Sequence, residues 1–328
     1  MFRKILVPLD HSPLAEQAIG PAAALARAAR AAMDLVLVHE PFHRSGYEAA
    51  ERRADRIDFD YKYLKSIAAE ITAGASVPTT VAVVAGEPAT MIRDRARAID
   101  ADLIVMTSHG RTGLSRAWLG STADALVHAA TTPVLMLRPT STGARKLASE
   151  KVYEHILVTL DGSARASDVL PAAEALAAAY NARLTLLQVV PHVPLAAAFD
   201  PMFPVWPPAM IPDVAASKQL ELGVAKEMNE LATRLHDRTK LAVDAAVVVS
   251  DHTAAAVVDF IRAQRIDVVA LSTQGRGGSR LLLGSIADKI VRSADVPVLL
   301  QRSAGTAEAV ELITSEAVAD QLPAIAPA

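Results

Sequence analysis

The chain has 328 residues, of which 52% are hydrophobic and 21% charged, enough for a large core and too apolar for wholesale disorder. Its 33 basic and 36 acidic residues leave a net charge of -3, which argues against a dedicated nucleic-acid binder. The lack of cysteine excludes disulfides, thiolate catalysis and cysteine-ligated metal centres. No apolar stretch is long enough to span a membrane and the N-terminus shows no secretory signal, so we expect a cytoplasmic protein without a membrane partner.

The sequence is internally duplicated. The segment Ile-Leu-Val-Pro-Leu-Asp-His-Ser around Asp10 returns around Asp161 as Ile-Leu-Val-Thr-Leu-Asp-Gly-Ser, and residues 103–138 return as residues 268–302. The residues repeated in this longer segment are Gly110, Arg111, Gly113, Ser115, Arg116, Gly120, Ser121, Ala123, Asp124, Pro133 and Arg138, with second copies Gly275, Arg276, Gly278, Ser279, Arg280, Gly284, Ser285, Ala287, Asp288, Pro297 and Arg302. Their shared order predicts two copies of one fold in tandem.

Each copy alternates short β-branched apolar runs with Ala-rich helical runs, a pattern typical of parallel strands joined by helices. The predicted strands are residues 5–9, 35–39, 81–84, 103–106 and 134–137, then 156–160, 184–190, 243–249, 268–271 and 298–300. The predicted helices are residues 13–32, 91–99 and 122–130, then 164–180, 254–263 and 286–293, the first capped by Ser12 with Pro13 at its first position. We therefore expect an α/β fold of two tandem doubly wound domains, each a five-stranded, mostly parallel sheet with helices on both faces.

The predicted domains are residues 1–140 and 152–303, with a polar linker at 141–151 and a flexible tail at 304–328. Residues 191–212 carry several prolines and three large aromatic residues, so we expect a long irregular loop there. Loops of that length are usually functional lids or disordered.

Two segments of the first copy indicate a nucleotide cleft. Ligands of an open parallel sheet bind beyond the carboxyl ends of its strands, where the strand order reverses. Asp10 follows the first strand there, and a carboxylate can bind ribose hydroxyls or the adenine amine. The glycine-rich segment 110–121 follows the fourth strand, and glycine lets backbone N–H groups approach phosphate oxygens. A helix N-terminus near Ser121 would add further N–H groups for an anion.

These parts and their order resemble the universal stress protein family, over nearly the whole chain to about residue 303. Residues 5–10 resemble that family's first strand with its adenosine-contacting aspartate, and residues 107–121 resemble its ATP-binding signature, G-x-x-G, nine residues, G-[S/T]. The resemblance implies ATP, or AMP or ADP, as ligand with Mg²⁺ as a companion ion, and pairing through the fifth strands. That pair could be intramolecular, a pseudo-dimer, and a homodimer of such chains stays open. The implied nucleotide-binding residues are Pro8, Leu9, Asp10, Glu40, Met106, Thr107, Gly110, Arg111, Gly113, Gly120, Ser121 and Thr122, then Asp161, Gly275, Gly278, Gly284 and Ser285 in the second copy.

The second copy departs further from the signature than the first. Thr107 and Ser272 replace the first glycine of the signature in the two copies, and each adds a Cβ near the expected ligand. The second copy also has one residue fewer between Gly275 and Gly284. The G-x-P turn after the third strand, at Gly86, becomes Asp-His-Thr in the second copy, which is unfavourable beside phosphates. The first copy is therefore the predicted ATP site on every count but one, because the second copy keeps the family's usual Asp-Gly-Ser where the first has Asp10-His11-Ser12.

Simpler roles for the same residues stay open. Ser121 with Asp124 fits a helix capping box, and an aspartate after a strand, such as Asp10, often only stabilises a turn. Arg111 could approach phosphates or lie solvated on the surface. The nine histidines show no metal-binding spacing.

Three functions follow as hypotheses. The first is a stress-response or signalling protein that binds an adenine nucleotide, ATP first, in the first-copy cleft. The alternative is a nucleotide-free protein-interaction module on the same duplicated fold, for an unidentified protein partner. An enzyme is the third and weakest, because no nucleophile with a base, acid–base pair, Walker A motif or metal-binding motif is visible in the sequence. Slow ATP hydrolysis stays open, but catalysis is not the predicted purpose.

Overall fold

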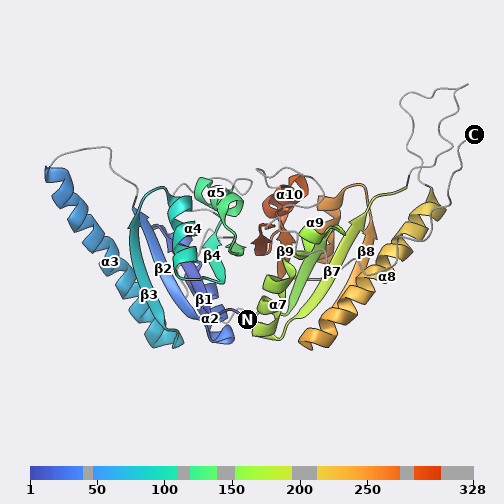
Figure 1. Ribbon diagram of the computed structural model, residues 1–328, viewed down its shortest axis with the longest axis horizontal. Coiled ribbons are helices and arrows are strands. Elements are labelled where there is room, and N and C mark those ends of the chain that lie inside the picture. The colour runs from blue at the N-terminus through green and yellow to red at the C-terminus, as the bar shows by residue number, and fades with distance from the viewer. Residues whose placement is uncertain (40–46, 109–118, 139–151, 194–212, 274–283, 304–328) are drawn as a thin grey trace, which may run out of the picture.

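The computed structural model describes residues 1–39, 47–108, 119–138, 152–193, 213–273 and 284–303, without the side chains of residues 47–54. The predicted linker and tail, and all but the first three residues of the predicted loop 191–212, lie outside these residues. Within them the chain forms two similar α/β halves side by side (Figure 1).

Both halves follow the same order of elements. The N-terminal half consists of β1 (Lys4–Leu9), α1 (Pro13–Glu16), α2 (Ile19–Ala29), β2 (Ala32–His39), α3 (Tyr47–Ala75), β3 (Thr79–Ala85), α4 (Pro88–Ala98), β4 (Leu103–Thr107), α5 (Ser121–Ala129) and β5 (Val134–Leu137). The C-terminal half consists of β6 (His155–Leu160), α6 (Ala164–Ser167), α7 (Leu170–Tyr180), β7 (Arg183–Val190), α8 (Val214–Thr239), β8 (Val243–Val249), α9 (Thr253–Ala263), β9 (Val268–Ser272), α10 (Ser285–Ser293) and β10 (Val298–Gln301).

The strands form one sheet of ten, in the order β3-β2-β1-β4-β5-β10-β9-β6-β7-β8. Neighbouring strands within each half are parallel, whereas β5 and β10 pair antiparallel, with Leu135 opposite Leu299. The fifth strands of the two halves thus pair within one chain, as the family resemblance implies. This antiparallel pair joins the two half-sheets edge to edge.

Helices cover both faces of the sheet, and each face has its own core, as the doubly wound fold requires. Figure 1 shows α5 and α10 near the centre on one face, α2 and α7 near the centre on the other, and α3 and α8 along the outer flanks. One core lies between the sheet and α2, α3, α7 and α8, and the other between the sheet and α4, α5, α9 and α10. The central strands are buried almost throughout, which explains their continuous apolar sequences.

The first helix of each half is shorter than predicted, because proline interrupts it. A continuous helix would need residue 21 to donate its backbone N–H to the carbonyl of residue 17, and Pro21 has none. The helix therefore ends after α1 and restarts as α2, with Pro21 in its first turn. In the C-terminal half, Pro171 is the second residue of α7, one position earlier in its helix than Pro21 is in α2. The predicted cap is confirmed: the Ala15 N–H donates to Ser12 Oγ at 3.0 Å, with Pro13 next in the chain.

Two long helices, α3 and α8, were not expected from the sequence. Their composition is mostly polar, and among the described residues of α3 the buried apolar side chains form a stripe in its C-terminal half, at Leu64, Ile67, Ala68 and Ile71. This spacing of three and four residues is typical of an amphipathic helix and is the signal that would have revealed it. Met228, Ala232 and Leu235 form the matching stripe of α8.

Candidate functional site

The topology brings two predicted segments of the N-terminal half to one place. Strand β1 pairs with β2 on one side and with β4 on the other, so the strand order reverses between β1 and β4. Ile5 and Leu6 lie opposite Leu103 and Ile104, and both strands run in the same direction. The residues that follow β1 and β4, among them Asp10, therefore lie at adjacent carboxyl ends, where ligands of such sheets bind.

Asp10 begins a tight turn that leads from β1 into α1. Its Oδ1 accepts the backbone N–H of Ser12 at 3.0 Å, the hydrogen bond of an Asx turn. In the C-terminal half, Asp161 Oδ1 accepts both the N–H of Ser163 at 2.9 Å and its hydroxyl at 2.6 Å. The aspartate thus stabilises the turn in both halves, which is the simpler role left open by the sequence.

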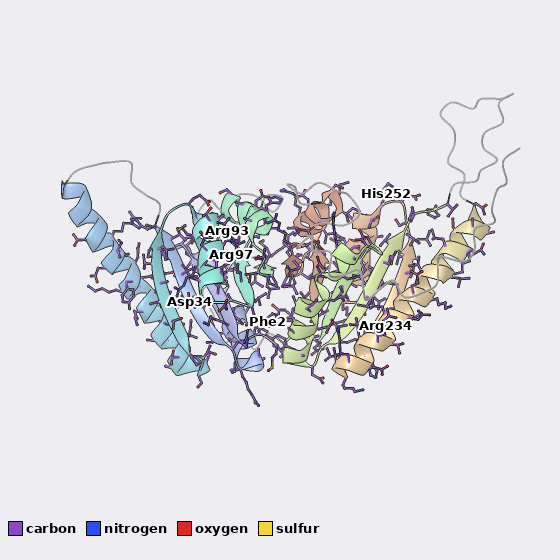
Figure 2. All side chains as sticks on the ribbon, viewed as in Figure 1. Phe2, Asp34, Arg93, Arg97, Arg234 and His252 are labelled. Carbon is purple, nitrogen blue, oxygen red and sulfur yellow. The ribbon has the colours of Figure 1, made fainter. Side chains whose placement is uncertain are left out.

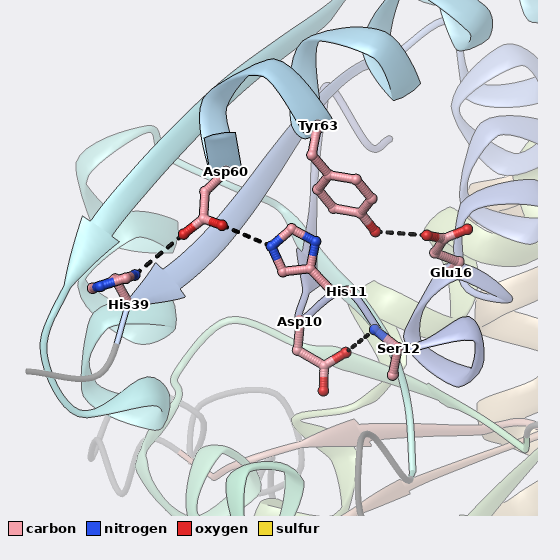
Figure 3. A network of polar contacts seen from close by, with 7 residues as sticks. All are labelled: Asp10, His11, Ser12, Glu16, His39, Asp60 and Tyr63. Atoms are coloured by element: carbon pink, nitrogen blue, oxygen red, sulfur yellow. Dashed lines mark hydrogen bonds and ion pairs between the residues drawn. The ribbon is translucent and has the colours of Figure 1, made fainter. Parts of the chain in front are cut away.

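A network of histidine and aspartate surrounds this turn on the α3 side (Figure 3). The Nε2 atom of His11 lies 2.8 Å from Asp60 Oδ1, and Nδ1 of His39 lies 3.2 Å from Asp60 Oδ2. Asp60 and His39 are buried, and Tyr63, whose ring centroid is 4.2 Å from that of His11, donates its hydroxyl to Glu16 at 2.7 Å. Sequence analysis missed this network because its members come from three separate elements.

The glycine-rich loop after β4 is closed at its base by a backbone hydrogen bond. The N–H of Gly120 donates to the carbonyl of Ser108 at 2.8 Å, and Gly284 donates to Thr273 at 2.9 Å in the second half. A Cβ on Gly284 would lie 3.3 Å from the Thr273 carbonyl oxygen, so glycine eases this approach. Gly120 is therefore held beside the end of β4, and Gly284 beside the end of β9.

The capping box that Ser121 and Asp124 fit in the sequence is not formed. Helices α5 and α10 begin at Ser121 and Ser285, so Gly120 and Gly284 occupy the N-cap positions. Neither glycine carries a side chain that could accept an N–H, and no side chain of the described residues makes this cap bond in either helix. Among the described residues, no side chain therefore caps the first backbone N–H groups of α5, and such N–H groups at a helix N-terminus favour an anion.

The remaining predicted nucleotide-binding residues fall into three groups. Pro8 and Leu9 of β1, and Met106 and Thr107 of β4, are buried at the carboxyl ends of their strands. Ser121 is exposed and Thr122 half-buried in the first turn of α5. The other predicted nucleotide-binding residues lie outside the described part of the chain: Glu40, Gly110, Arg111, Gly113, Gly275 and Gly278.

Comparison with known proteins identifies the fold family. The family model described as "Universal stress protein family" matches residues 1–138 and again residues 152–302. The chain belongs to the universal stress protein family. It is 28% identical to Universal stress protein A homolog 1 of Coxiella burnetii over 147 residues, which cover 45% of this chain and 94% of that protein. It is 32% identical to a universal stress protein of Mycobacterium tuberculosis over 139 residues, 41% of this chain and 45% of that protein.

A solved structure shows the same fold along the chain. The crystal structure of a universal stress protein from Archaeoglobus fulgidus matches with a TM-score of 0.63 at 17% identity, covering 92% of this chain and 98% of that one. A protein of Pseudomonas aeruginosa, titled as functionally unknown, matches with a TM-score of 0.57 at 16% identity and covers 92% of this chain and 93% of its own. The tandem form of the universal stress protein fold is therefore shown for this chain.

The two halves of this universal stress protein differ at the edge formed by their second and third strands. Gly86 has φ 153°, and a Cβ there would lie 2.7 Å from Met91 Cγ, so glycine is required. Next to it, Glu87 caps α4 by accepting the N–H groups of Ala89 and Thr90, at 3.0 and 2.7 Å. Hydrogen bonds from Thr90 lower the pKa of the Glu87 carboxyl below its usual range.

The C-terminal half has a different arrangement at this edge. The Asp251 carboxylate accepts the backbone N–H of His192 at 3.0 Å and lies 2.9 Å from its Nδ1. These hydrogen bonds lower the pKa of the Asp251 carboxyl. Among the described residues, no group of three or more histidine, aspartate or glutamate side chains could hold a metal ion, and no helix is long and apolar enough to cross a membrane.

Proposed function

We propose that the N-terminal half of this universal stress protein binds an adenine nucleotide, with ATP the first choice ahead of AMP and ADP. The observation that carries the proposal is the meeting of Asp10 and the uncapped N-terminus of α5 at the carboxyl ends of the adjacent strands β1 and β4. The carboxylate would bind ribose or adenine, and the amides of α5 would bind phosphate.

The family signature supports the choice of this half. Residues 107–121 keep the signature's spacing, whereas the second copy is one residue shorter between Gly275 and Gly284. The described residues at this edge offer the Asp10 carboxylate and the first backbone amides of α5 to a ligand, so we propose a binding protein rather than an enzyme, with Mg²⁺ held through the nucleotide's own phosphates. We also propose a cytoplasmic location, which cell fractionation would test.

The test is calorimetric titration of the full chain with ATP and AMP, alongside mass spectrometry of nucleotide that copurifies. Asp10→Ala is the test variant and Asp161→Ala its matched control, because each removes the same turn hydrogen bond from one half. We expect binding of one nucleotide per chain, weakened about 10- to 100-fold by Asp10→Ala, since hydrogen bonds to charged groups contribute about 1.5–3 kcal/mol. Asp161→Ala should leave this affinity unchanged.

Two results would contradict the proposal. A folded wild-type chain that neither copurifies with nucleotide nor binds ATP would favour the nucleotide-free interaction module. Equal weakening by both alanine variants would assign binding to a general property of the turns rather than to the N-terminal cleft. A turnover assay with ATP separates binding from catalysis, and multiple turnovers at the rate of a typical enzyme, about 1 per second or faster, would overturn the assignment as a binding protein.

A further inference from the structure

We propose that His11, Asp60 and His39 form a positioning network that holds the Asp10 turn in its ligand-binding shape, so that nucleotide affinity in the N-terminal half depends on helix α3. This inference rests on the proposed function for its nucleotide. The network joins three elements: His11 follows β1, His39 ends β2 and Asp60 lies in α3 (Figure 3).

The Asp60 carboxylate lies at the centre of the network. Its side chain is 2% exposed, and each of its oxygens faces one imidazole nitrogen, at 2.8 Å for His11 and 3.2 Å for His39. A carboxylate can only accept, so His11 Nε2 and His39 Nδ1 each carry the donated hydrogen. A buried charge is tolerated only when it is well hydrogen-bonded, so these two bonds fix both rings relative to α3.

His11 needs support because its backbone is strained. Its φ is 65°, in the left-handed region that a non-glycine residue rarely adopts. The residue lies between Asp10 and Ser12, whose hydrogen bond defines the turn, and its side chain leaves the turn on the side opposite the Asp10 carboxylate (Figure 3). The bond to Asp60 and the packing on Tyr63 hold the His11 ring, and thereby the φ that directs Asp10 toward the cleft.

The C-terminal half solves the same problem without a network. Gly162 replaces His11 and has φ 78°, which costs glycine no strain. Asp60 precedes the buried Leu64 by four residues, as Val224 precedes the buried Met228, so Val224 takes the place of Asp60. Val190 ends β7 as His39 ends β2. Glycine with two valines therefore replaces all three members, and the network belongs to the N-terminal turn alone.

The decisive test compares Asp60→Asn in the wild-type chain with the double variant His11→Gly/Asp60→Asn. Asp58→Asn is the matched control, because Asp58 lies in the same helix, is 60% exposed and pairs only locally with Lys62. The first readout is hydrogen exchange of the Ser12 amide, measured by NMR in the full chain without nucleotide. The second is the dissociation constant of ATP.

We expect Asp60→Asn to accelerate Ser12 exchange and to weaken ATP binding, each by about tenfold, the factor that matches the strain of one left-handed non-glycine residue. In the His11→Gly background both effects should vanish, because glycine holds the turn unaided. Asp58→Asn should change neither quantity.

A purely structural role of Asp60 predicts a different pattern, in which exchange rises along the whole of α3 and persists in the His11→Gly background. That pattern, or unchanged Ser12 exchange in a folded Asp60→Asn variant, would overturn the inference. If the wild-type chain does not bind ATP while Ser12 exchange follows the expected pattern, the proposed function fails and the positioning of the turn stands.

Discussion

Replacing Arg95 with methionine should destabilise the protein strongly, because it leaves a buried carboxylate without its cation. Asp34 lies in β2 beneath α4 and is 1% exposed (Figure 2). Arg95 binds it with two hydrogen bonds, Nε to Oδ1 at 3.0 Å and Nη2 to Oδ2 at 2.7 Å, and the Thr80 hydroxyl donates to Oδ2 at 2.5 Å. Removing one partner of a buried ion pair costs about 3–5 kcal/mol.

Removing the other partner of the ion pair should lower the free energy of unfolding by less. In Asp34→Asn the remaining charge belongs to Arg95, whose side chain is 26% exposed and can be hydrated, so we expect about 1.5–3 kcal/mol, the contribution of hydrogen bonds to a charged group. Urea unfolding followed by circular dichroism measures both. With a slope of about 3 kcal/mol/M, the midpoint should fall by about 1–1.7 M for Arg95→Met and about 0.5–1 M for Asp34→Asn. Equal losses, or a loss below about 1 kcal/mol for Arg95→Met, would show that Asp34 is not a desolvated charge and would refute the reasoning.

Three further changes test other parts of the fold. Tyr180→Phe should leave the melting temperature unchanged or raise it, because it removes a hydroxyl that is buried without a hydrogen-bond partner among the described residues. The same burial raises the pKa of Tyr180 to about 12. A clear loss of stability would contradict this prediction. Glu87→Gln should lower the free energy of unfolding by about 0.5–1 kcal/mol at neutral pH. Because the pKa of Glu87 in the folded protein lies below the ordinary 4.5, this difference in stability from the wild type should disappear as the pH falls through that pKa. A difference in stability that persists in acid would argue against the carboxylate cap. Leu299→Ala should lower the free energy of unfolding by about 2–5 kcal/mol, because Leu299 is fully buried opposite Leu135. In calorimetry the two halves should then unfold in two separate transitions. A single transition at the wild-type temperature would show that the β5–β10 pair does not couple the two halves.

The strands could be predicted from the sequence to within a few residues, because each is a short β-branched run buried on both faces. Strand β5 begins and ends as predicted, and β2 begins three residues early, at Ala32, because the chain passes directly from the left-handed Arg30 into the sheet. The helices were harder to predict, because only part of each helix carries a recognisable sequence pattern. Helix α3 has only a short buried stripe, and the break before α2 depends on the single missing N–H of Pro21.

The candidate site, too, could be predicted from the sequence only in part. The neighbourhood of Asp10 and Gly120 follows from topology, because the carboxyl ends of adjacent parallel strands must lie together. The pairing of Asp60 with His11 and His39 spans 49 and 21 residues of sequence, and no local pattern reports such contacts. A histidine in the place that glycine holds in the second copy is the single sequence feature that could have drawn attention to it.

The antiparallel β5–β10 pair joins the two halves into one continuous sheet. Within this sheet, the adjacent strands β1 and β4 of the N-terminal half and β6 and β9 of the C-terminal half lie on opposite sides of the central pair. Each half therefore has its own pair of adjacent carboxyl ends. The residues of the two halves differ at these ends: the N-terminal half keeps the signature spacing and has the His11–Asp60–His39 network beside its turn, whereas the C-terminal half has a glycine turn and an Asp251–His192 pair at its edge. The two copies thus share the packing of the sheet and its helices, while the residues around their candidate sites differ.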